Sequence, residues 1–492
     1  MYTIKKIRPP SISDHPEKPR VLDMSTSESE VHVALLSSAG MGHLTPFLRL
    51  AALLAHNNLR VTLIVTRPTV SLAESHLLAR FRSSLPQVKI LDFHLLPLDP
   101  STVNSSDPFW LRFEAIRRSS HLLSPLILSL QPPLSAFVLD IMLISPVIPI
   151  TRALSLPSFV LFTSSVKMLS FFSHLPTSSF LADDDDVCIP GISPIPRSSI
   201  PPPLLVPDSL FAKIFFQDSS HLKKLDGVLI NSFKELEPET IDAINGEETL
   251  RKLLPPVFDI GPFMPCEFEK VDNENSVDCP LKWLDEQPED SVVYVSFGSR
   301  TAMKRDQIRE IGDGLMRSGC RFVWVVKDKP VDREEEEELE EVVGHELMVK
   351  LKKKGLVVKT WVDQREILGH RSVGGFVSHC GWNSVVEAAW YGVRIMAWPL
   401  NGDQRINADV VEKSGLGVWE KKWGWGQVVN GEEIGERIRE MMNDESLKKS
   451  AQKLRDAARE AVGDGGTSHV AFQRLTGEWK KKKKKNASVS VA

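Results

Sequence analysis

Two stretches of the sequence place chemically active side chains after a buried strand, at the point where a helix begins. In the first, the apolar run Val31 to Ser37 leads through a glycine turn to His43. In the second, the apolar run Gly374 to Ser378 leads to the segment His379 to Ser384, which contains a glycine. An imidazole can act as a general base near neutral pH. A helix start offers unpaired backbone N–H groups and the positive end of the helix dipole to a phosphate. The sequence therefore predicts phosphate binding at the second place and offers a histidine whose role remains to be explained at the first.

The second stretch carries further polar groups on the face of its helix. Glu387 lies three residues after Ser384 and four after Asn383, so all three side chains share one face. A carboxylate in that place can accept hydrogen bonds from both hydroxyls of a ribose. Upstream, Trp361 offers a flat surface on which a base can stack. Each residue also has an ordinary structural alternative, as a core aromatic or as a solvated helix residue.

The first stretch does not fit a dinucleotide-binding fingerprint. Such a fingerprint needs a third small residue where Thr45 stands, and an acidic residue ending the next strand, where Thr66 and Arg67 stand. A nicotinamide-dependent oxidoreductase is therefore disfavoured. For His43 the alternatives are a structural histidine and a catalytic base.

The elements that must position these residues follow a strand–helix alternation typical of parallel α/β sheets. Continuous apolar runs predict strands buried on both faces by crossover helices. The predicted strands of the first series are 31–37, 61–66, 88–95, 136–140 and 158–162, with helices expected over 43–56 and 109–130. Residues 228–231 and an apolar segment around 256–260 follow before the linker. Those of the second series are 292–297, 322–326, 356–359, 374–378 and 394–398. The two series predict two Rossmann-like, doubly wound halves that face each other across a cleft. Ligands bind at the carboxyl ends of the strands in such sheets, so the cleft can hold two substrates.

Changes in composition along the chain predict its division into domains, a linker and two tails. We expect a flexible N-terminal tail over 1–30, a first domain over 31–260, a linker over 261–280, a second domain over 281–479 and a basic tail over 480–492. The last helix of the second domain could pack back on the first. The proline-dense stretch 182–208 predicts a long surface loop.

The 492 residues carry a net charge of −4, which favours neither nucleic acid nor an anionic membrane as a partner. The most apolar stretch, 136–150, is interrupted by Asp140, Pro146 and Pro149, so we expect no membrane span. The first 30 residues lack the apolar core of a secretory signal. Five cysteines without a CxxC pair favour reduced thiols. Together these features predict a cytoplasmic protein.

The ordered set between Trp361 and Gln404 resembles the signature box of the plant family-1 UDP-sugar glycosyltransferases. Its members in this sequence are Trp361, Gln364, His379, Gly381, Trp382, Asn383, Ser384, Glu387, Asp403 and Gln404. The resemblance extends from about Val31 to Trp479. It implies a GT-B-like fold and a UDP-sugar in the second half.

The resemblance also implies a role for each part of the box. Trp361 would stack on uracil and Glu387 would hold the ribose. His379, Asn383 and Ser384 would bind the diphosphate, with Ser299 as a further phosphate contact. Trp382, Asp403 and Gln404 would contact the sugar, and a final Gln usually accompanies glucose. Most relatives have Glu where Asp403 stands, so here the reach to the sugar is one carbon shorter.

The glycine turn before His43 is similar to the catalytic turn of the same family, in which a proline, here Pro46, follows three residues later. Asp140 ends a predicted strand that should lie nearby. By this resemblance His43 is the general base, and Asp140 holds the imidazole in the tautomer that leaves the other ring nitrogen to accept the proton. Attack opposite the leaving UDP would invert the anomeric carbon.

Four short motifs are similar to those of plant flavonoid C-glycosyltransferases. They are Asp107-Pro108-Phe109, Ser299-Arg300-Thr301-Ala302-Met303, Asn401-Gly402-Asp403-Gln404-Arg405 and Trp423-Gly424-Trp425-Gly426. The resemblance implies that Asp107, Pro108 and Phe109 contribute to acceptor binding, although Asp and Pro at these positions also suit a simple helix start.

The sequence therefore predicts an inverting, metal-independent and cofactor-free enzyme that transfers glucose from UDP-glucose to an aromatic carbon of a flavonoid or related polyphenol. We expect it to act as a monomer. An O-glucosyltransferase for the same acceptors is the nearest alternative, and a non-catalytic nucleotide-sugar binding protein is the alternative from another class.

Overall fold

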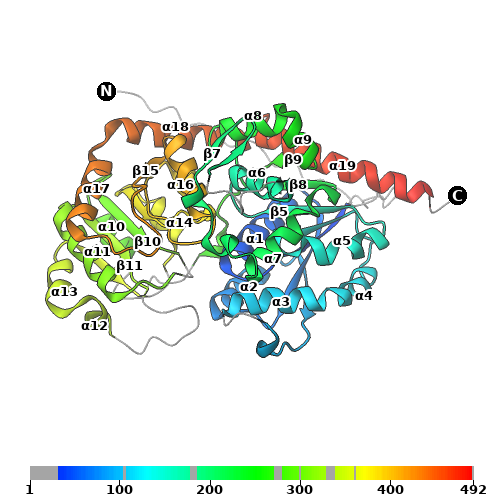
Figure 1. The fold of residues 1–492 in the computed structure, drawn as a ribbon, viewed down its shortest axis with the longest axis horizontal. Coiled ribbons are helices and arrows are strands. Elements are labelled where there is room, and N and C mark those ends of the chain that lie inside the picture. Colours follow the sequence, from blue (N-terminus) through cyan, green and yellow to red (C-terminus); the bar gives the residue numbers. More distant parts are fainter. Residues whose placement is uncertain are drawn as a thin grey trace, which may run out of the picture. The chain divides into compact units, whose positions relative to one another are not determined.

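Two parallel sheets, each covered by helices, organise the chain (Figure 1). The computed structural model describes residues 31–103, 107–177, 185–270, 280–298, 301–327, 338–359 and 362–489. We call residues 31–260 the N-terminal half and residues 280–466 the C-terminal half.

The sheet of the N-terminal half has the strand order β3-β2-β1-β4-β5-β8-β9. Its strands are β1 (His32–Leu36), β2 (Arg60–Arg67), β3 (Lys89–His94), β4 (Ala136–Asp140), β5 (Ser158–Phe162), β8 (Gly227–Ile230) and β9 (Val257–Asp259). Every pairing is parallel. The chain winds outward in one direction from β1 and in the other from β4, so a topological switch point lies between these two neighbours.

The sheet of the C-terminal half repeats this arrangement, with the order β12-β11-β10-β13-β14-β15. Its strands are β10 (Val292–Ser296), β11 (Arg321–Val325), β12 (Gly355–Val358), β13 (Val373–Ser378), β14 (Arg394–Ala397) and β15 (Gly417–Trp419). The switch point here lies between β10 and β13, which pair in parallel. The sequence pattern did not reveal β15, because three residues are too short for an apolar run to stand out.

Helices lie between successive strands of both halves, and the C-terminal half also has helices before its first strand and after its last. In the N-terminal half they are α1 (Met41–His56), α2 (Leu72–Ser84), α3 (Pro108–Ser119), α4 (Leu123–Leu128), α5 (Ile144–Ala153), α6 (Val166–His174), α7 (Leu210–Ser219), α8 (Pro238–Gly246) and α9 (Glu248–Leu253). In the C-terminal half they are α10 (Pro280–Asp285), α11 (Arg305–Ser318), α12 (Leu339–Val343), α13 (His345–Leu351), α14 (Gln364–Leu368), α15 (Trp382–Tyr391), α16 (Gln404–Lys413), α17 (Gly431–Asn443) and α18 (Glu445–Val462). The single helix predicted over 109–130 is divided into α3 and α4, because Pro125 cannot donate the backbone hydrogen bond that would continue α3.

The prediction of a long surface loop over 182–208 needs correction, because the described part of this stretch, from residue 185, contains regular structure. A hairpin of β6 (Val187–Ile189) and β7 (Ile192–Ile195) lies in this stretch, followed by two short 3-10 helices. Gly191 at its tip has a φ of +75°, which a glycine adopts without strain. Both strands bury apolar side chains in the core of the N-terminal half, so burial of alternate residues outweighs the surrounding prolines.

The last helix, α19 (Thr467–Val489), returns to the N-terminal half (Figure 1). Phe472, Leu475 and Trp479 belong to the same buried cluster as β1 and α1. Lys482 forms an ion pair with Asp226 at 2.5 Å. The prediction of a flexible basic tail from residue 480 needs correction, since α19 continues to Val489. Lysine is a good helix former and nothing in the run interrupts the helix.

The segment that follows β9 also packs on the N-terminal half. Phe263 and Phe268 join the buried cluster of β1 and α1. Glu269 lies in a short 3-10 helix (Glu267–Glu269) that leads toward the C-terminal half. Residues 271–279, the remainder of the predicted linker, lie outside the described residues.

Candidate active site

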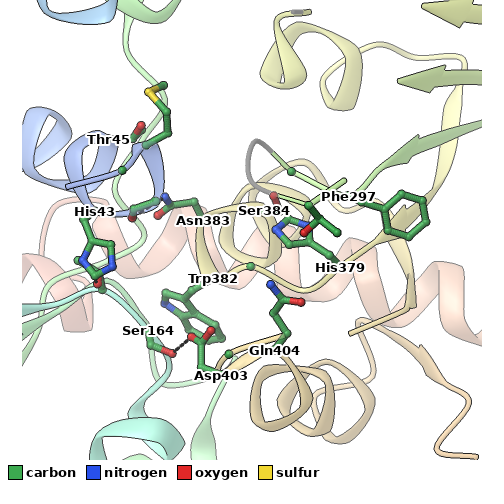
Figure 2. A pocket seen from close by; sticks show the side chains of 18 of the residues that line it. His43, Thr45, Ser164, Phe297, His379, Trp382, Asn383, Ser384, Asp403 and Gln404 are labelled. Atoms are coloured by element: carbon green, nitrogen blue, oxygen red, sulfur yellow. Dashed lines mark hydrogen bonds between the residues drawn. The ribbon is translucent and has the colours of Figure 1, made fainter. Parts of the chain in front are cut away.

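A cavity of about 450 Å³ is lined by residues from both halves. This volume is in the range of small-molecule sites. Its walls include the turns that follow β1, β4 and β5 in the N-terminal half and β10 and β13 in the C-terminal half. Both switch points therefore open into one cavity, and Figure 2 shows His43 on one side of it and His379 and Gln404 on the other.

His43 and Asp140 meet because they follow neighbouring strands. β1 and β4 pair in parallel, so the residues beyond their carboxyl ends share one edge of the sheet. His43 Nδ1 lies 2.8 Å from Asp140 Oδ2, and Thr163 Oγ1 lies 3.3 Å from the same nitrogen. The Asp140 carboxylate is fully buried and its Oδ1 accepts a hydrogen bond from the backbone N–H of Met142 at 3.0 Å. Because a carboxylate accepts the Nδ1 proton, Nε2 is the nitrogen suited to take a proton from an acceptor.

The turn before His43 depends on a glycine. Gly40 has a φ of +96°, and a Cβ there would lie 3.1 Å from Cε1 of Phe109. Phe109 thus packs behind the turn that carries the histidine. The imidazole itself lies edge-on to Phe113, with ring centroids 5.7 Å apart.

The structure places Asp107, Pro108 and Phe109 outside the cavity lining. The Asp107 side chain accepts a hydrogen bond from the backbone N–H of Phe109 at 2.8 Å and so caps α3, with Pro108 as its first residue. The next turn of α3 provides the lining side chains Trp110 and Phe113. The triplet therefore fixes the start of α3, and aromatic residues further along that helix line the cavity.

At the opposite side, α15 begins directly beyond β13 with Gly381 as its N-cap. No side chain caps this end. The N–H groups of the first turn, from Trp382 to Ser384, therefore have no intrahelical acceptors, and these residues line the cavity. With the positive end of the helix dipole, this is a suitable place for a diphosphate.

His379 lies in the short connection between β13 and α15 and packs against two glycines. A Cβ at Gly298 would lie 2.6 Å from His379 Nε2, and one at Gly381 would lie 2.5 Å from it. Burial lowers the pKa of His379 to about 4, so the imidazole is neutral at pH 7. Its Nδ1 is buried and has no hydrogen-bond partner in the part of the chain that the structure describes. A neutral imidazole with an unused nitrogen beside a helix start is well placed to donate to a phosphate oxygen.

Three further residues predicted for the donor site, one on α14 and two on α15, form one hydrogen-bonded group, and a fourth contacts the N-terminal half. Gln364 Nε2 donates to Ser384 Oγ at 3.0 Å and to Glu387 Oε2 at 2.8 Å. Asn383 Nδ2 donates to the carbonyl oxygen of Gly42 at 3.2 Å, a contact between α15 and α1. The structure therefore brings together the predicted residues Gln364, Asn383, Ser384 and Glu387.

The predicted sugar-binding residues differ in how many of their polar atoms already have hydrogen-bond partners in the protein. Trp382 is buried and its indole N–H donates to the carbonyl of Asn231 at 2.8 Å. Gln404 uses its amide within its own loop, where Oε1 accepts from the N–H groups of Leu400 and Asn401 at 2.8 and 2.9 Å.

Asp403 makes a contact between the two halves. Its Oδ2 accepts hydrogen bonds from the Ser164 hydroxyl (Figure 2) and from Asn407 Nδ2. Its Oδ1 has no partner among the described residues, so one oxygen remains for a sugar hydroxyl. Ser164 follows β5 in the N-terminal half, and no sequence motif indicated it.

Two predicted donor-binding residues, Ser299 and Trp361, lie outside the described residues. Sequence reasoning missed Arg49 on α1, whose Nη2 donates to Glu387 Oε1 at 2.5 Å. The available signal was a single arginine on an otherwise apolar helix, Phe47 to Leu54, where a buried charge needs a partner.

Two of the subgroup motifs meet in space. The guanidinium of Arg405 lies 5.1 Å from the ring centroid of Trp419 and 5.3 Å from that of Trp425. Trp425 in turn donates its indole N–H to the carbonyl of Ser198 in the N-terminal half at 3.0 Å. These motifs therefore build a contact between the halves on the helix, α16, that begins with Gln404.

Comparisons with known proteins agree with this architecture. The family model "UDP-glucoronosyl and UDP-glucosyl transferase" matches residues 249–460. The chain is 53% identical over 469 residues to UDP-glycosyltransferase 708G2 of Citrus unshiu, covering 93% of this chain and 98% of that protein. It is 46% identical to UDP-glycosyltransferase CGT of Oryza sativa subsp. japonica, covering 90% and 96%.

Among solved structures, the fold matches LpCGTa in complex with UDP with a TM-score of 0.81 and 44% identity, covering 92% of this chain and 99% of that one. It matches TcCGT1 in complex with UDP with a TM-score of 0.82 and 28% identity, covering 92% and 100%. The chain belongs to the plant family-1 UDP-glycosyltransferases, has their GT-B fold, and within them resembles the C-glycosyltransferase type.

Two further features bear on the class of protein. No helix in the described ranges is both long and apolar enough to cross a bilayer. Within the same ranges, His, Cys, Asp and Glu side chains form no group of three that could hold a metal ion. Cys188, Cys266, Cys320 and Cys380 are free thiols, and Cys279 lies outside the described residues.

Proposed function

We propose that this UDP-glycosyltransferase transfers glucose from UDP-glucose to an aromatic carbon of a flavonoid or related polyphenol, with inversion at the anomeric carbon. The observation that carries the proposal is the His43–Asp140 pair, held at 2.8 Å on the side of the cavity opposite the uncapped start of α15. A base on one side and an anion site on the other suit a displacement in which a nucleophile attacks while a diphosphate departs.

In this mechanism His43 Nε2 accepts a phenolic proton while Asp140 stabilises the imidazolium that forms. A phenol has a pKa of about 10 and an imidazole about 6.5, so the transfer must accompany bond formation. The negative charge spreads to the ring carbon ortho to the oxygen. That carbon bonds to C1 of glucose and the bond from C1 to the diphosphate oxygen breaks. Transfer of the ring C–H proton through solvent to the phenolic oxygen then restores the aromatic phenol, and the proton held by His43 leaves to solvent.

The departing UDP carries the developing charge on the donor side. The unpaired N–H groups at the start of α15 and the neutral His379 are the groups proposed to stabilise it, without a metal. Glu387 is proposed to accept hydrogen bonds from the ribose and Asp403 Oδ1 from the sugar. Trp361 and Ser299 keep their proposed roles with uracil and phosphate.

Transfer to carbon is supported by the resemblance to the proteins named CGT and to LpCGTa, and by the aromatic wall of Trp110 and Phe113. An acceptor turned to present its oxygen would give an O-glucoside with the same base, so orientation of the ring decides the product. The four free thiols support a reducing compartment, which suits the proposed cytoplasmic monomer.

The test is incubation with UDP-glucose and a panel of polyphenols, followed by mass spectrometry and acid treatment of each product. The expected result is a hexoside that survives acid. A product that releases its sugar in acid would establish the O-glucosyltransferase instead. Absence of any product, with UDP still bound, would favour a nucleotide-sugar binding protein.

A further inference from the structure

Arg49 is a buried cation on the face of α1 that meets the C-terminal half. Its side chain is 2% exposed. Its Nε and Nη2 donate to the two carboxylate oxygens of Glu269 at 2.8 and 2.6 Å, and Nη2 also donates to Glu387 Oε1 at 2.5 Å. One guanidinium therefore joins α1, the segment after β9, and α15.

Two carboxylates share this one cation. Burial by itself lowers the pKa of Arg49, but the charges of Glu269 and Glu387 outweigh it and raise the pKa above its ordinary value. Arg49 therefore stays charged and supplies the positive charge that both carboxylates contact.

The contacts of Glu387 fix both oxygens of its carboxylate. Arg49 holds Oε1 from the N-terminal half, and Gln364 holds Oε2 at 2.8 Å from the C-terminal half. Each carboxylate oxygen accepts up to two hydrogen bonds, so each still has one acceptor position for a ligand hydroxyl. The spacing of the two oxygens suits two neighbouring hydroxyls, as on a ribose.

A second observation points toward a ligand. Nη1 of Arg49 is buried and lacks a hydrogen-bond partner in the described part of the chain, although Arg49 lines the cavity. An unused donor on a buried guanidinium is costly, and native sites normally satisfy it. Arg49 therefore has a hydrogen-bond donor left over beyond its two ion pairs.

We propose that Arg49 is a positioning residue of the donor site, which holds the Glu387 carboxylate in the orientation that accepts the ribose hydroxyls of a nucleoside diphosphate. The proposal rests on the ribose-binding role proposed for Glu387. It makes recognition of the ribose depend on a residue of the half that carries the catalytic base, 338 positions away in the sequence. A purely structural bridge between the halves is the alternative.

The two roles differ in what they do to ribose discrimination. If Arg49 positions Glu387, its loss weakens binding of UDP much more than binding of 2′,3′-dideoxy-UDP, which has no ribose hydroxyls. If Arg49 only joins the two halves, its loss weakens binding of both nucleotides by the same factor.

The experiment is titration calorimetry of UDP and 2′,3′-dideoxy-UDP with the wild type, Arg49→Met, Glu387→Gln and the double variant. We expect the wild type to prefer UDP by about tenfold or more, as loss of hydrogen bonds to a charged group implies, and Arg49→Met to lose most of this preference. In the Glu387→Gln background, Arg49→Met should cause little further loss of preference, because the two residues act as a unit.

The matched control is Arg117→Met. Arg117 is also a largely buried arginine of the N-terminal half, paired with Asp218 at 2.8 Å, and it does not line the cavity. Its substitution should leave the preference for UDP unchanged. If Arg49→Met does not fold, Arg49→Lys is measured in its place. A lysine ammonium cannot reproduce the hydrogen bonds of the guanidinium to both carboxylates, so the preference for UDP should fall. A fully retained preference for UDP would overturn the proposal.

The outcomes separate this inference from the proposed function. An unchanged preference in Arg49→Met together with a lost preference in Glu387→Gln overturns the role of Arg49 alone. An unchanged preference in Glu387→Gln overturns the ribose assignment on which it rests. Equal weakening of both nucleotides in Arg49→Met establishes a structural bridge.

Discussion

The two switch points of the molecule have the same topology and opposite chemistry. Each places a histidine beyond the carboxyl end of a strand, His43 after β1 and His379 after β13, next to a glycine and at a helix start. The side chain of His43 is 26% exposed and is held by the buried Asp140, whereas His379 is partly buried and its Nδ1 is buried without a partner among the described residues. A carboxylate partner prepares an imidazole to accept a proton, and burial without one keeps an imidazole neutral. The comparison teaches that the same strand–turn–helix geometry can prepare an imidazole for either of two roles, proposed here as a base in one half and as part of an anion site in the other.

The largest expected effect comes from His43→Ala. Without the base, glucosyl transfer should fall by about 10² to 10⁴-fold or become undetectable. The affinity for UDP should stay unchanged, because the hydrogen bonds of His43 to Asp140 and Thr163 involve none of the residues proposed to bind UDP. Product formation by mass spectrometry and UDP binding by calorimetry are the two measurements. A loss of UDP affinity with transfer retained would break the comparison between the two histidines.

The next effect tests the partner of the base. Asp140→Asn keeps a side chain of the same size but removes the charge that stabilises the imidazolium, and can turn the ring to the wrong tautomer. We expect the turnover number to fall by about 10²-fold or more with little change in KM for UDP-glucose. Initial rates at several UDP-glucose concentrations check this, and an unchanged turnover number would show that His43 does not depend on Asp140.

A smaller effect is expected from a pair of glycine substitutions, one at each switch point. In Gly381→Ala the new Cβ would lie 2.5 Å from His379 Nε2, so the imidazole or the helix start must shift. In Gly42→Ala the new Cβ meets no atom within 4 Å. UDP affinity measured by calorimetry should fall by about tenfold in Gly381→Ala and remain close to that of the wild type in Gly42→Ala. Equal affinities would contradict the assignment of His379 to the diphosphate.

The smallest effect concerns stability and pH. The pKa of His379 is about 4 in the folded protein because of burial, and about 6.5 when the chain is unfolded. A lowered pKa contributes stability that is complete above pH 6.5 and is lost as the pH falls toward 4. Between pH 7 and pH 5 the wild type should lose about 2 kcal/mol of unfolding free energy that His379→Asn does not lose. Urea denaturation of both proteins at the two pH values tests this, and parallel losses would show that His379 is not buried as a neutral ring.

Much of the fold and part of the site could be predicted from local patterns. Apolar runs located most strands to within about a residue, because a strand buried on both faces must be continuously apolar. The helix start at α15 and the pairing of His43 with Asp140 followed from residues placed at strand ends. The exceptions are short or mixed elements, such as β15 and the hairpin β6–β7, whose burial depends on the rest of the core.

The sequence by itself determined the order of the longer strands and helices, the helix start proposed to bind an anion, and the histidine that follows the first strand. Only the tertiary structure decided that Arg49 meets Glu387, that Ser164 meets Asp403, and that Phe109 packs behind the turn of His43 while Trp110 and Phe113 line the cavity. The physical reason is the distance along the sequence between the residues that interact. Strand ends and helix starts arise from interactions between near neighbours in the chain. The partners of a buried charge depend instead on how the N-terminal and C-terminal halves pack together, and no local sequence pattern contains that information.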